Sequence, residues 1–309
     1  MKPRFCVVSL NPAIDVEWRV DDLRWEEKNL VTQQRRWAGG KGANVARWLK
    51  FLGSDCELLL PLGGVTGDEL LDHLIAEKVR THVIPVRGET RANVVITAGN
   101  GRQMRFNQPG ALLTKKHWRA ILSHLHERAG QCVHPILSGS IAPGQPGDTY
   151  AKVLRKLRGS TVRTFLDCDG DALKLAIPER PFLVKPNRHE LSQWIGRKLS
   201  SLDSVRKAAL VMSRATGGWV LVSLSGDGAL LVNAIEGFSD RVCAGKVKVA
   251  NTLGAGDATL AAAAHAAIRG ASPGEWLRAA VAAGTAATQC EAGRLISRSA
   301  FNGIAGKIR

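Results

Sequence analysis

A glycine turn that leads into an alanine-rich stretch is the segment of this sequence best suited to chemistry. Residues 246–258 read Lys-Val-Lys-Val-Ala-Asn-Thr-Leu-Gly-Ala-Gly-Asp-Ala and continue into a predicted helix that ends near Arg269. A strand that enters such a turn and opens a helix directs backbone N–H groups and the positive end of the helix dipole to one point. The pattern therefore predicts an anion site lined by Gly254, Ala255 and Gly256, with Asp257 at its edge.

Asp257 has two interpretations. It is either an ordinary cap of the helix, or a base that accepts a proton from a substrate hydroxyl while the glycine amides stabilise a transferring phosphoryl group. Because a carboxylate at a helix N-terminus should be acidic, we expect its position, rather than its basicity, to supply most of its effect. A dinucleotide-binding fingerprint fits less well, since Thr259 stands where G-x-G-x-x-G requires its third glycine.

A second glycine cluster, Gly39-Gly40-Lys41-Gly42, precedes Asn44 and a predicted helix. The missing β-carbons let a polar ligand approach the main chain, and Lys41 adds positive charge. The cluster does not match the G-x-x-x-x-G-K-[ST] phosphate loop. Taken alone, it is an ordinary turn more often than a binding site.

The elements that must position these motifs alternate along most of the chain. Apolar runs predict strands at residues 5–10, 56–62, 135–137, 163–166, 182–184 and 219–224, and helical patterns lie between them, such as 43–52 before Gly53. This alternation predicts an α/β fold with a mainly parallel sheet covered by helices. We expect residues 1–309 to form a single domain.

Two segments have a different period. Residues 16–20 and the hairpin-like stretch 93–106, with its Asn100-Gly101 turn, alternate apolar and polar residues. Period-two alternation indicates a sheet with one wet face, so we predict a small β-sheet lid built from about 13–37 and 88–109. Because an uncovered sheet face is a liability, we also predict a homodimer that pairs through the lid.

Composition limits the partners. The chain has 309 residues and a net charge of +16, which first suggests nucleic acid, yet no run reaches five basic residues. We interpret the charge, most of it in residues 151–309, as solvated surface, and predict no nucleic-acid partner and no membrane partner.

The six cysteines form no C-x-x-C pair, as expected for reduced, mostly buried thiols of a cytoplasmic protein. The longest apolar region, 258–268, is too short to span a membrane.

The two glycine motifs, in this order, resemble those of the ribokinase-like sugar kinases. Within them the chain is most similar to the phosphofructokinase B branch, which includes bacterial fructose-1-phosphate and tagatose-6-phosphate kinases. The resemblance covers almost the whole chain and rests on residues 11–15, 39–46, 90–94, 138–140, 183–191, 222–229 and 251–258. It implies a three-layer αβα domain with a β lid, an ATP-dependent kinase, and Mg²⁺ as cofactor.

The resemblance also assigns the sugar-phosphate side of the site. Arg91 falls where this branch grips the existing phosphate of its substrate, which suits the planar fork of a guanidinium, although a solvated lid arginine is the alternative. Lys28 would add to that phosphate site, and Ser138 or Ser140 would face the substrate unless they form an ordinary turn. The residues implied to hold sugar hydroxyls are Asp15, Gly39, Gly40, Lys41 and Asn44.

The nucleotide side follows in the same way. Asn187 and Glu190 are implied to hold Mg²⁺ through water, although a helix cap made by the same pair is the alternative. Residues 280–288 resemble the helix beside the adenine, or else pack closely against a neighbouring helix. Asn251 stands where the wider family often has Asp, and Ala258 replaces a common Ser. The remaining residues implied to contact ATP are Lys185, Ser223, Ser225, Gly226, Gly228 and Thr252.

The resulting expectation is phosphorylation of a ketohexose phosphate, with fructose 1-phosphate giving fructose 1,6-bisphosphate as the first choice. Tagatose 6-phosphate and fructose 6-phosphate are alternative substrates, because their kinases use the same base and anion site. A basic nucleic-acid-binding protein on a kinase-like scaffold is the alternative from a different class.

Overall fold

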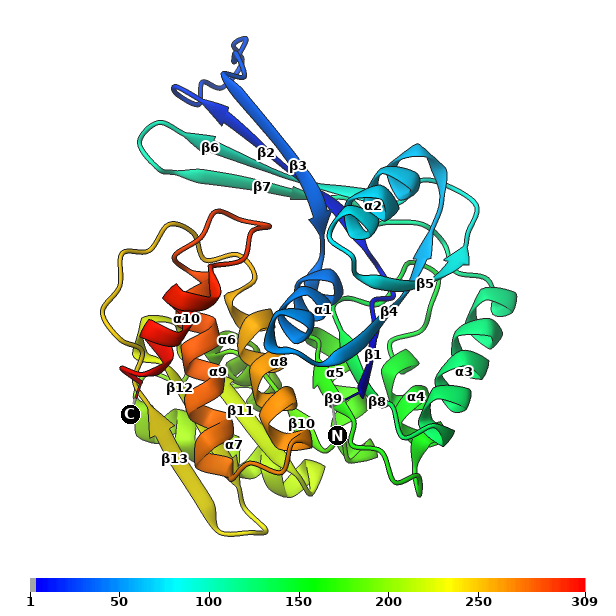
Figure 1. Cartoon of the computed structure of the whole chain (residues 1–309), viewed down its shortest axis with the longest axis vertical. Coiled ribbons are helices and arrows are strands. Elements are labelled where there is room, and N and C mark those ends of the chain that lie inside the picture. Colours follow the sequence, from blue (N-terminus) through cyan, green and yellow to red (C-terminus); the bar gives the residue numbers. More distant parts are fainter. Residues whose placement is uncertain (1–3, 309) are drawn as a thin grey trace.

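A nine-stranded sheet forms the centre of the computed structural model, which describes residues 4–308 (Figure 1). Its strand order is β13-β12-β11-β10-β9-β8-β1-β4-β5. The strands from β5 to β11 are parallel, and β12 and β13 are added antiparallel at one edge. The strands are β1 (Arg4–Val8), β4 (Asp55–Leu62), β5 (Arg80–Pro85), β8 (His134–Ser138), β9 (Phe165–Asp167), β10 (Leu183–Val184), β11 (Trp219–Ser223), β12 (Ala229–Asn233) and β13 (Phe238–Val242).

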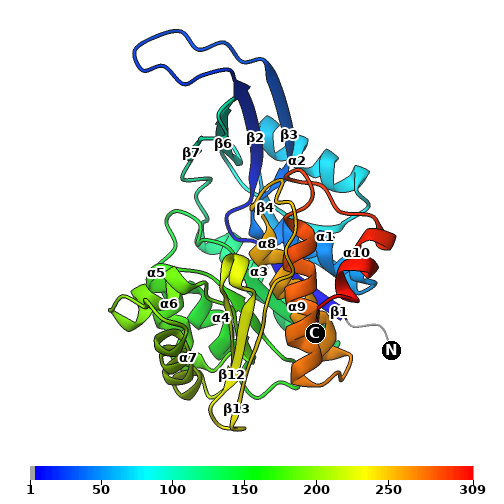
Figure 2. The ribbon, with the colours of Figure 1, turned by 90° about the vertical axis from the view of Figure 1, so that its left-hand side faces the viewer.

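Helices cover both faces of this sheet, because alternate strand residues are apolar on both sides: Phe5 and Val7 pack into one core, Cys6 and Val8 into the other. Figure 2 shows the sheet between the two helix layers. The predicted three-layer αβα architecture is confirmed. One layer contains α1 (Lys41–Leu52), α2 (Gly64–Ala76), α8 (Ala255–Ile268), α9 (Pro273–Ala287) and α10 (Arg298–Ala305). The other contains α3 (Lys115–Gly130), α4 (Thr149–Leu157), α5 (Gly170–Ala176), α6 (Arg188–Ile195) and α7 (Leu202–Thr216), together with the short 3-10 turn η1 (Ile177–Glu179).

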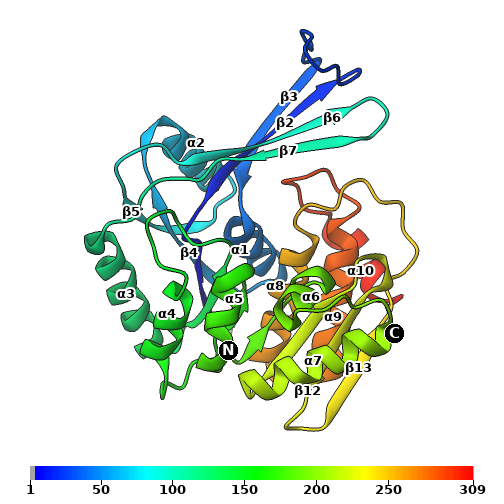
Figure 3. The same cartoon turned by 180° about the vertical axis from the view of Figure 1, so that it is seen from behind.

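A second, four-stranded sheet projects from one end of the core (Figure 3). Its order is β3-β2-β6-β7, formed by β2 (Ala13–Val20), β3 (Gln33–Gly39), β6 (Arg91–Ala98) and β7 (Gln103–Asn107). The predicted small sheet is therefore present, and its hairpin turns at Gly101, whose φ of 82° suits glycine. The register aligns Val16, Val94 and Phe106 on one face, and Asp15 with Asn93 on the other.

Two expectations about local structure are wrong. Residues 243–254 form no strand before the glycine turn, because Ala250 N–H and Asn251 N–H both donate to the Thr288 carbonyl at the end of α9 instead of to a neighbouring strand. The cysteines are all free, but of the six only Cys6 and Cys168 are buried. Within residues 4–308, no helix combines the length and apolar character that crossing a membrane requires.

Candidate active site

Polar residues gather where three parallel strands end. Ser138 is the last residue of β8, Asp167 is the last of β9, and Lys185 directly follows β10. The register places Ser138 beside Asp167, and Lys185 N–H donates to the Leu166 carbonyl. In open α/β sheets, ligands bind at this carboxyl edge. The N-termini of α1 and α8 carry the two glycine motifs to the same place.

Asp257 lies in the first turn of α8, and its residue is only 6% exposed. Its Oδ2 accepts a hydrogen bond of 2.8 Å from Asn44 Nδ2 on α1, so the two glycine motifs meet directly. Gly254 caps the helix with a φ of 78°, which a residue with a side chain rarely adopts. A β-carbon on Gly256 would lie 3.4 Å from Lys185 Nζ, so this lysine lies close to the turn.

Burial raises the pKa of Asp257 to about 6, and the nearby charge of Asp167 adds to the shift, against the opposing effects of Lys41, Asn44 and Lys185. The expectation of an unusually acidic carboxylate at the helix N-terminus is therefore wrong. The helix dipole favours the ionised form, but removal of the carboxylate from water outweighs it. A pKa near 6 leaves Asp257 ionised at pH 7 and a better proton acceptor than an exposed aspartate.

Asp167 is a site residue that the sequence reasoning missed. It is 1% exposed, and its two oxygens lie 2.9 Å from Lys41 Nζ and 3.1 Å from Lys185 Nζ. Although burial opposes it, the two ammonium groups hold the pKa of Asp167 below its usual value. The available signal was a carboxylate that ends the apolar strand Phe165–Asp167. Asp167 thus holds one lysine from each side of the site in a fixed position.

The sugar side is built at the base of the lid. Asn93 Nδ2 donates to Asp15 Oδ1 at 2.9 Å, and burial raises the pKa of Asp15. A β-carbon on Gly39 would lie 2.1 Å from the Asp15 carboxyl carbon, so glycine is required there. Gly40 adopts a φ of 82° where it caps α1. The structure therefore brings Asp15, Gly39 and Gly40 together, and adds Asn93, to which the sequence reasoning gave no role.

Two buried polar atoms at the base of the lid, Arg91 Nε and Asn93 Oδ1, lack hydrogen-bond partners among residues 4–308, as does Ser138 Oγ at the end of β8. The guanidinium of Arg91 is held through Nη1, which donates to the Gln108 carbonyl at 3.1 Å. Ser140 is occupied, because its Oγ accepts from Asn11 Nδ2 at 3.2 Å. Since buried polar groups are normally hydrogen-bonded, these unpartnered atoms favour a ligand at the site.

Lys28 does not join this group within the chain. It is exposed in the loop 21–32 that connects β2 to β3. Arg91 pairs with Ala13 at the base of the lid, whereas the loop begins beyond Val20 at the far end. At about 3.3 Å per residue, the length of β2 separates them by roughly 20 Å.

The nucleotide side shows the predicted alternative for Asn187 and Glu190. Asn187 Oδ1 accepts from Glu190 N–H, and Glu190 Oε2 accepts from Asn187 N–H, both at 2.8 Å, which is a reciprocal cap of α6. The other oxygen of Glu190 lies 3.9 Å from Lys41 Nζ. Ser223 forms a β-bridge with Asn187, which brings the end of β11 to the same place.

The other nucleotide-side residues are less closely gathered. Ser225, Gly226 and Gly228 form the tight turn between β11 and β12, around the 3-10 turn η2 (Ser225–Asp227). Thr252 is exposed in the segment before α8. Residues 280–287 belong to α9 and pack closely on α8, since a β-carbon on Gly284 would lie 2.5 Å from Thr259 Oγ1. Close helix packing therefore accounts for their small side chains.

Comparison with known proteins gives a consistent result. Residues 4–299 match the pfkB family of carbohydrate kinases. A 1-phosphofructokinase of Bacillus subtilis (strain 168) is 32% identical over 255 residues, 82% of each chain. Phosphofructokinase-2 of Escherichia coli in complex with fructose-6-phosphate is 31% identical, covers 98% of both chains and gives a TM-score of 0.89; a tetrameric inhibited form of it matches equally well. A possible 1-phosphofructokinase of Thermotoga maritima is 26% identical over 99% of this chain and 98% of its own, with a TM-score of 0.86.

Proposed function

The chain belongs to the pfkB family of carbohydrate kinases and is an ATP-dependent sugar-phosphate kinase, and on that premise we propose that it converts fructose 1-phosphate to fructose 1,6-bisphosphate. The observation that carries the phosphoryl transfer in this proposal is Asp257, a buried carboxylate with a raised pKa, at the glycine turn and beside Asn44. The 32% identity to a 1-phosphofructokinase over 82% of both chains supports the choice of substrate.

The site has two chemically different ends. At one end Arg91 offers an unpartnered buried Nε, which suits the existing phosphate of the sugar. At the other end Asp257 lies at the glycine turn. Lys41 lies on the side of Asp257, because its side chain approaches Gly139 near Ser138 and its ammonium reaches Asp167. A phosphorylated ketohexose with a free primary hydroxyl has this same two-ended character.

In the proposed reaction, the primary hydroxyl oxygen of the sugar forms a bond to the γ-phosphorus of ATP. The bond from that phosphorus to the β–γ bridging oxygen breaks, ADP leaves, and the hydroxyl proton passes to the Asp257 carboxylate. The amides of residues 254–256 at the start of α8 meet the charge on the transferring group. Lys185, 3.4 Å from the β-carbon position of Gly256, adds positive charge at the same point.

Mg²⁺ fits the oxygen-rich residues on the nucleotide side. Glu190 uses one carboxylate oxygen for the helix cap, and the other remains available to a water ligand beside Asn187. Bound with ATP, the ion would neutralise charge on the phosphates. We propose that Ser223, Ser225, Gly226, Gly228 and Thr252, on the β11–β12 turn and on the segment before α8, contact ATP.

Fructose 6-phosphate is the second candidate substrate. The likeness to phosphofructokinase-2, at 31% identity over 98% of both chains, favours it. Tagatose 6-phosphate, like fructose 6-phosphate, carries its phosphate on C6 and its free primary hydroxyl on C1.

One ATP-consumption assay over fructose 1-phosphate, fructose 6-phosphate, tagatose 6-phosphate and unphosphorylated fructose tests the proposal. We expect the highest kcat/KM with fructose 1-phosphate. A higher value with either 6-phosphate would overturn the substrate assignment but leave the kinase. Turnover on none of them, combined with salt-sensitive binding of DNA or RNA, would favour the nucleic-acid-binding alternative.

We also propose that two copies pair through their lids. On this lid face Val16 and Val94 pack against the protein's own core, and Val16 is 2% exposed, whereas Phe106 on the edge strand β7 remains 51% exposed. An exposed aromatic side chain on an open sheet edge favours pairing, and a second copy provides a complementary edge. We expect sedimentation at micromolar concentration to give a dimer, and Phe106→Lys to give a folded monomer. A monomeric parent protein would overturn this proposal.

A further inference from the structure

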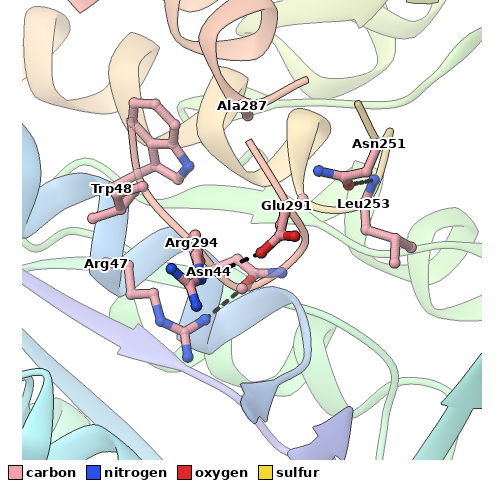
Figure 4. Close-up of a pocket in the computed structure, with 11 residues that line it drawn as sticks. Asn44, Arg47, Trp48, Asn251, Leu253, Ala287, Glu291 and Arg294 are labelled. Carbon is pink, nitrogen blue, oxygen red and sulfur yellow. Dashed lines mark hydrogen bonds and ion pairs between the residues drawn. The ribbon is translucent and has the colours of Figure 1, made fainter. Parts of the chain in front are cut away.

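Arg47 is a buried arginine on α1 to which the proposed reaction gives no role. Its residue is 5% exposed, and it donates to both oxygens of Glu77, at 2.5 and 3.0 Å. It also donates to the carbonyl of Ala38 in the lid strand β3 and, through Nη1, to Asn44 Oδ1 at 2.9 Å. Figure 4 shows the guanidinium and the Asn44 amide pointing toward one another.

This contact decides which way the Asn44 amide faces. A guanidinium carries five donors and no acceptor, so the oxygen of Asn44 must face Arg47. The amide NH₂ group is then left for Asp257 Oδ2, at 2.8 Å. An ionised carboxylate only accepts hydrogen bonds, so this orientation suits the form of Asp257 that takes a proton. The reversed amide would place an oxygen against the carboxylate and repel it.

We propose that Arg47 is a positioning residue that fixes the Asn44 amide with its NH₂ group toward the Asp257 carboxylate. The inference rests on the proposed role of Asp257 as the proton acceptor. The same guanidinium holds Ala38, which precedes the Gly39 that packs on Asp15. Arg47 thus ties the base of the lid to the proton acceptor.

The other charged groups around Asp257 are held separately from Arg47. Lys41 on α1, Asp167 at the end of β9 and Lys185 after β10 act on its charge. Their contacts are with one another and with Glu190. Around Arg47 itself the charged groups are Glu77, which follows α2, and Glu291 and Arg294, which line the same pocket. The charge of Arg47 also acts on Asp15, where it opposes the burial that raises the pKa of that carboxyl. Loss of Arg47 therefore leaves the lysine pair on Asp167 in place.

The test is the pH dependence of kcat for Arg47→Met, measured with the best substrate of the assay above. Without the oriented amide the ionised form of Asp257 loses a hydrogen bond, so its pKa rises and the acidic limb moves to higher pH. We expect a shift of about one pH unit, with roughly fivefold slower turnover at pH 6 that converges on the parent value by pH 9.

Glu77→Gln is the matched control, because it removes the ion pair of Arg47 but leaves the contact with Asn44. We expect it to lower the Tm without moving the acidic limb. Arg47→Lys keeps a cationic donor group and should recover part of the shift. If Arg47→Met does not fold, Arg47→Leu decides, since its side chain has no donor to offer Asn44.

Folded Arg47→Met or Arg47→Leu with an unmoved acidic limb would overturn the positioning role, as would an equal shift in Glu77→Gln. Failure of the underlying function looks different. In that case Asp257→Asn would retain near-parental turnover, whatever the Arg47 variants do.

Discussion

Two buried carboxylates, Asp257 and Glu57, differ in how their charge is compensated. Asp257 lies at the carboxyl edge of the sheet and accepts one side-chain hydrogen bond, from Asn44. Glu57 lies on β4 under the opposite helix layer and accepts three, from His124 at 2.7 Å and from Arg128 at 2.9 and 3.0 Å. Their residues are 6% and 4% exposed, so burial does not distinguish them.

Their pKa values move in opposite directions. Burial raises the pKa of Asp257 to about 6, whereas the donors from His124 and Arg128 outweigh burial and lower the pKa of Glu57. Ligand atoms of Cys6, Glu57 and His124 lie within 4.8 Å of one another, but the guanidinium of Arg128 already holds both oxygens of Glu57. A buried carboxylate with enough hydrogen-bond donors and positive charge around it holds structural elements together. One with too few of them is a better proton acceptor.

Asp257→Asn should have the largest effect on catalysis. The amide cannot accept the hydroxyl proton, so we expect kcat to fall by about 10³-fold or more, at the upper part of the range for a general base. Because the substitution removes a buried charge, the free energy of unfolding at pH 7 should not fall. Calorimetry should show that the sugar phosphate still binds. A kcat within threefold of the parent would remove Asp257 from the reaction.

Glu57→Gln should show the reverse pattern. It leaves the half-buried Arg128 facing an uncharged partner, and we expect the free energy of unfolding to fall by about 2 kcal/mol. Turnover at saturating substrate should stay within twofold of the parent, because the cluster lies on another part of the sheet. Urea denaturation and steady-state kinetics on one preparation measure both. A large loss of kcat without destabilisation would refute the contrast.

The pH dependence of the free energy of unfolding should also distinguish the two carboxylates. The pKa of Asp257 is raised in the folded protein, from 3.8 to about 6. Its contribution to stability is therefore present below pH 3.8 and lost as pH rises through 6. The pKa of Glu57 is lowered from 4.5, so its contribution is present above pH 4.5 and is lost as pH falls through the folded value.

These signs predict that Asp257→Asn gains stability over the parent as pH rises from 4 to 7, and that Glu57→Gln approaches the parent below pH 4. The kcat of the parent should fall about tenfold per pH unit below pH 6, since protonated Asp257 cannot accept a proton. Parallel stability curves for the parent and both variants between pH 3 and 7 would show that neither carboxylate titrates as inferred.

The sequence predicts the parts of the site that local motifs encode. The turn at Gly254 and the cluster at Gly39 mark places where the backbone must come close to another group, and the structure places both there. The alternating strands likewise predict the small sheet, because period two is visible along the chain. Asp257 and Asn44 can be predicted as site residues from the sequence because each lies beside one of these turns.

The rest depends on contacts between distant segments. Asp167 ends a short apolar strand, and its importance appears only when the parallel register brings it to Lys41 and Lys185. The raised pKa of Asp257 comes from burial that α1 helps to create, which a helix-end argument does not include. Arg47 looks like surface charge in the sequence until Ala38, Asn44 and Glu77 surround it.

The proposed phosphate grip and the proposed base belong to different sheets. Arg91 begins a strand of the small sheet, and Asp257 opens a helix packed on the large one. The span between them is therefore set by how the two sheets are joined, at short connections such as 9–12 and 86–90. The core sheet carries the proposed reaction, and the lid sheet sets how far from it the phosphate of the substrate is held. Exchange of the lid strands between relatives should therefore change which sugar phosphate is accepted, while the reaction stays with the core.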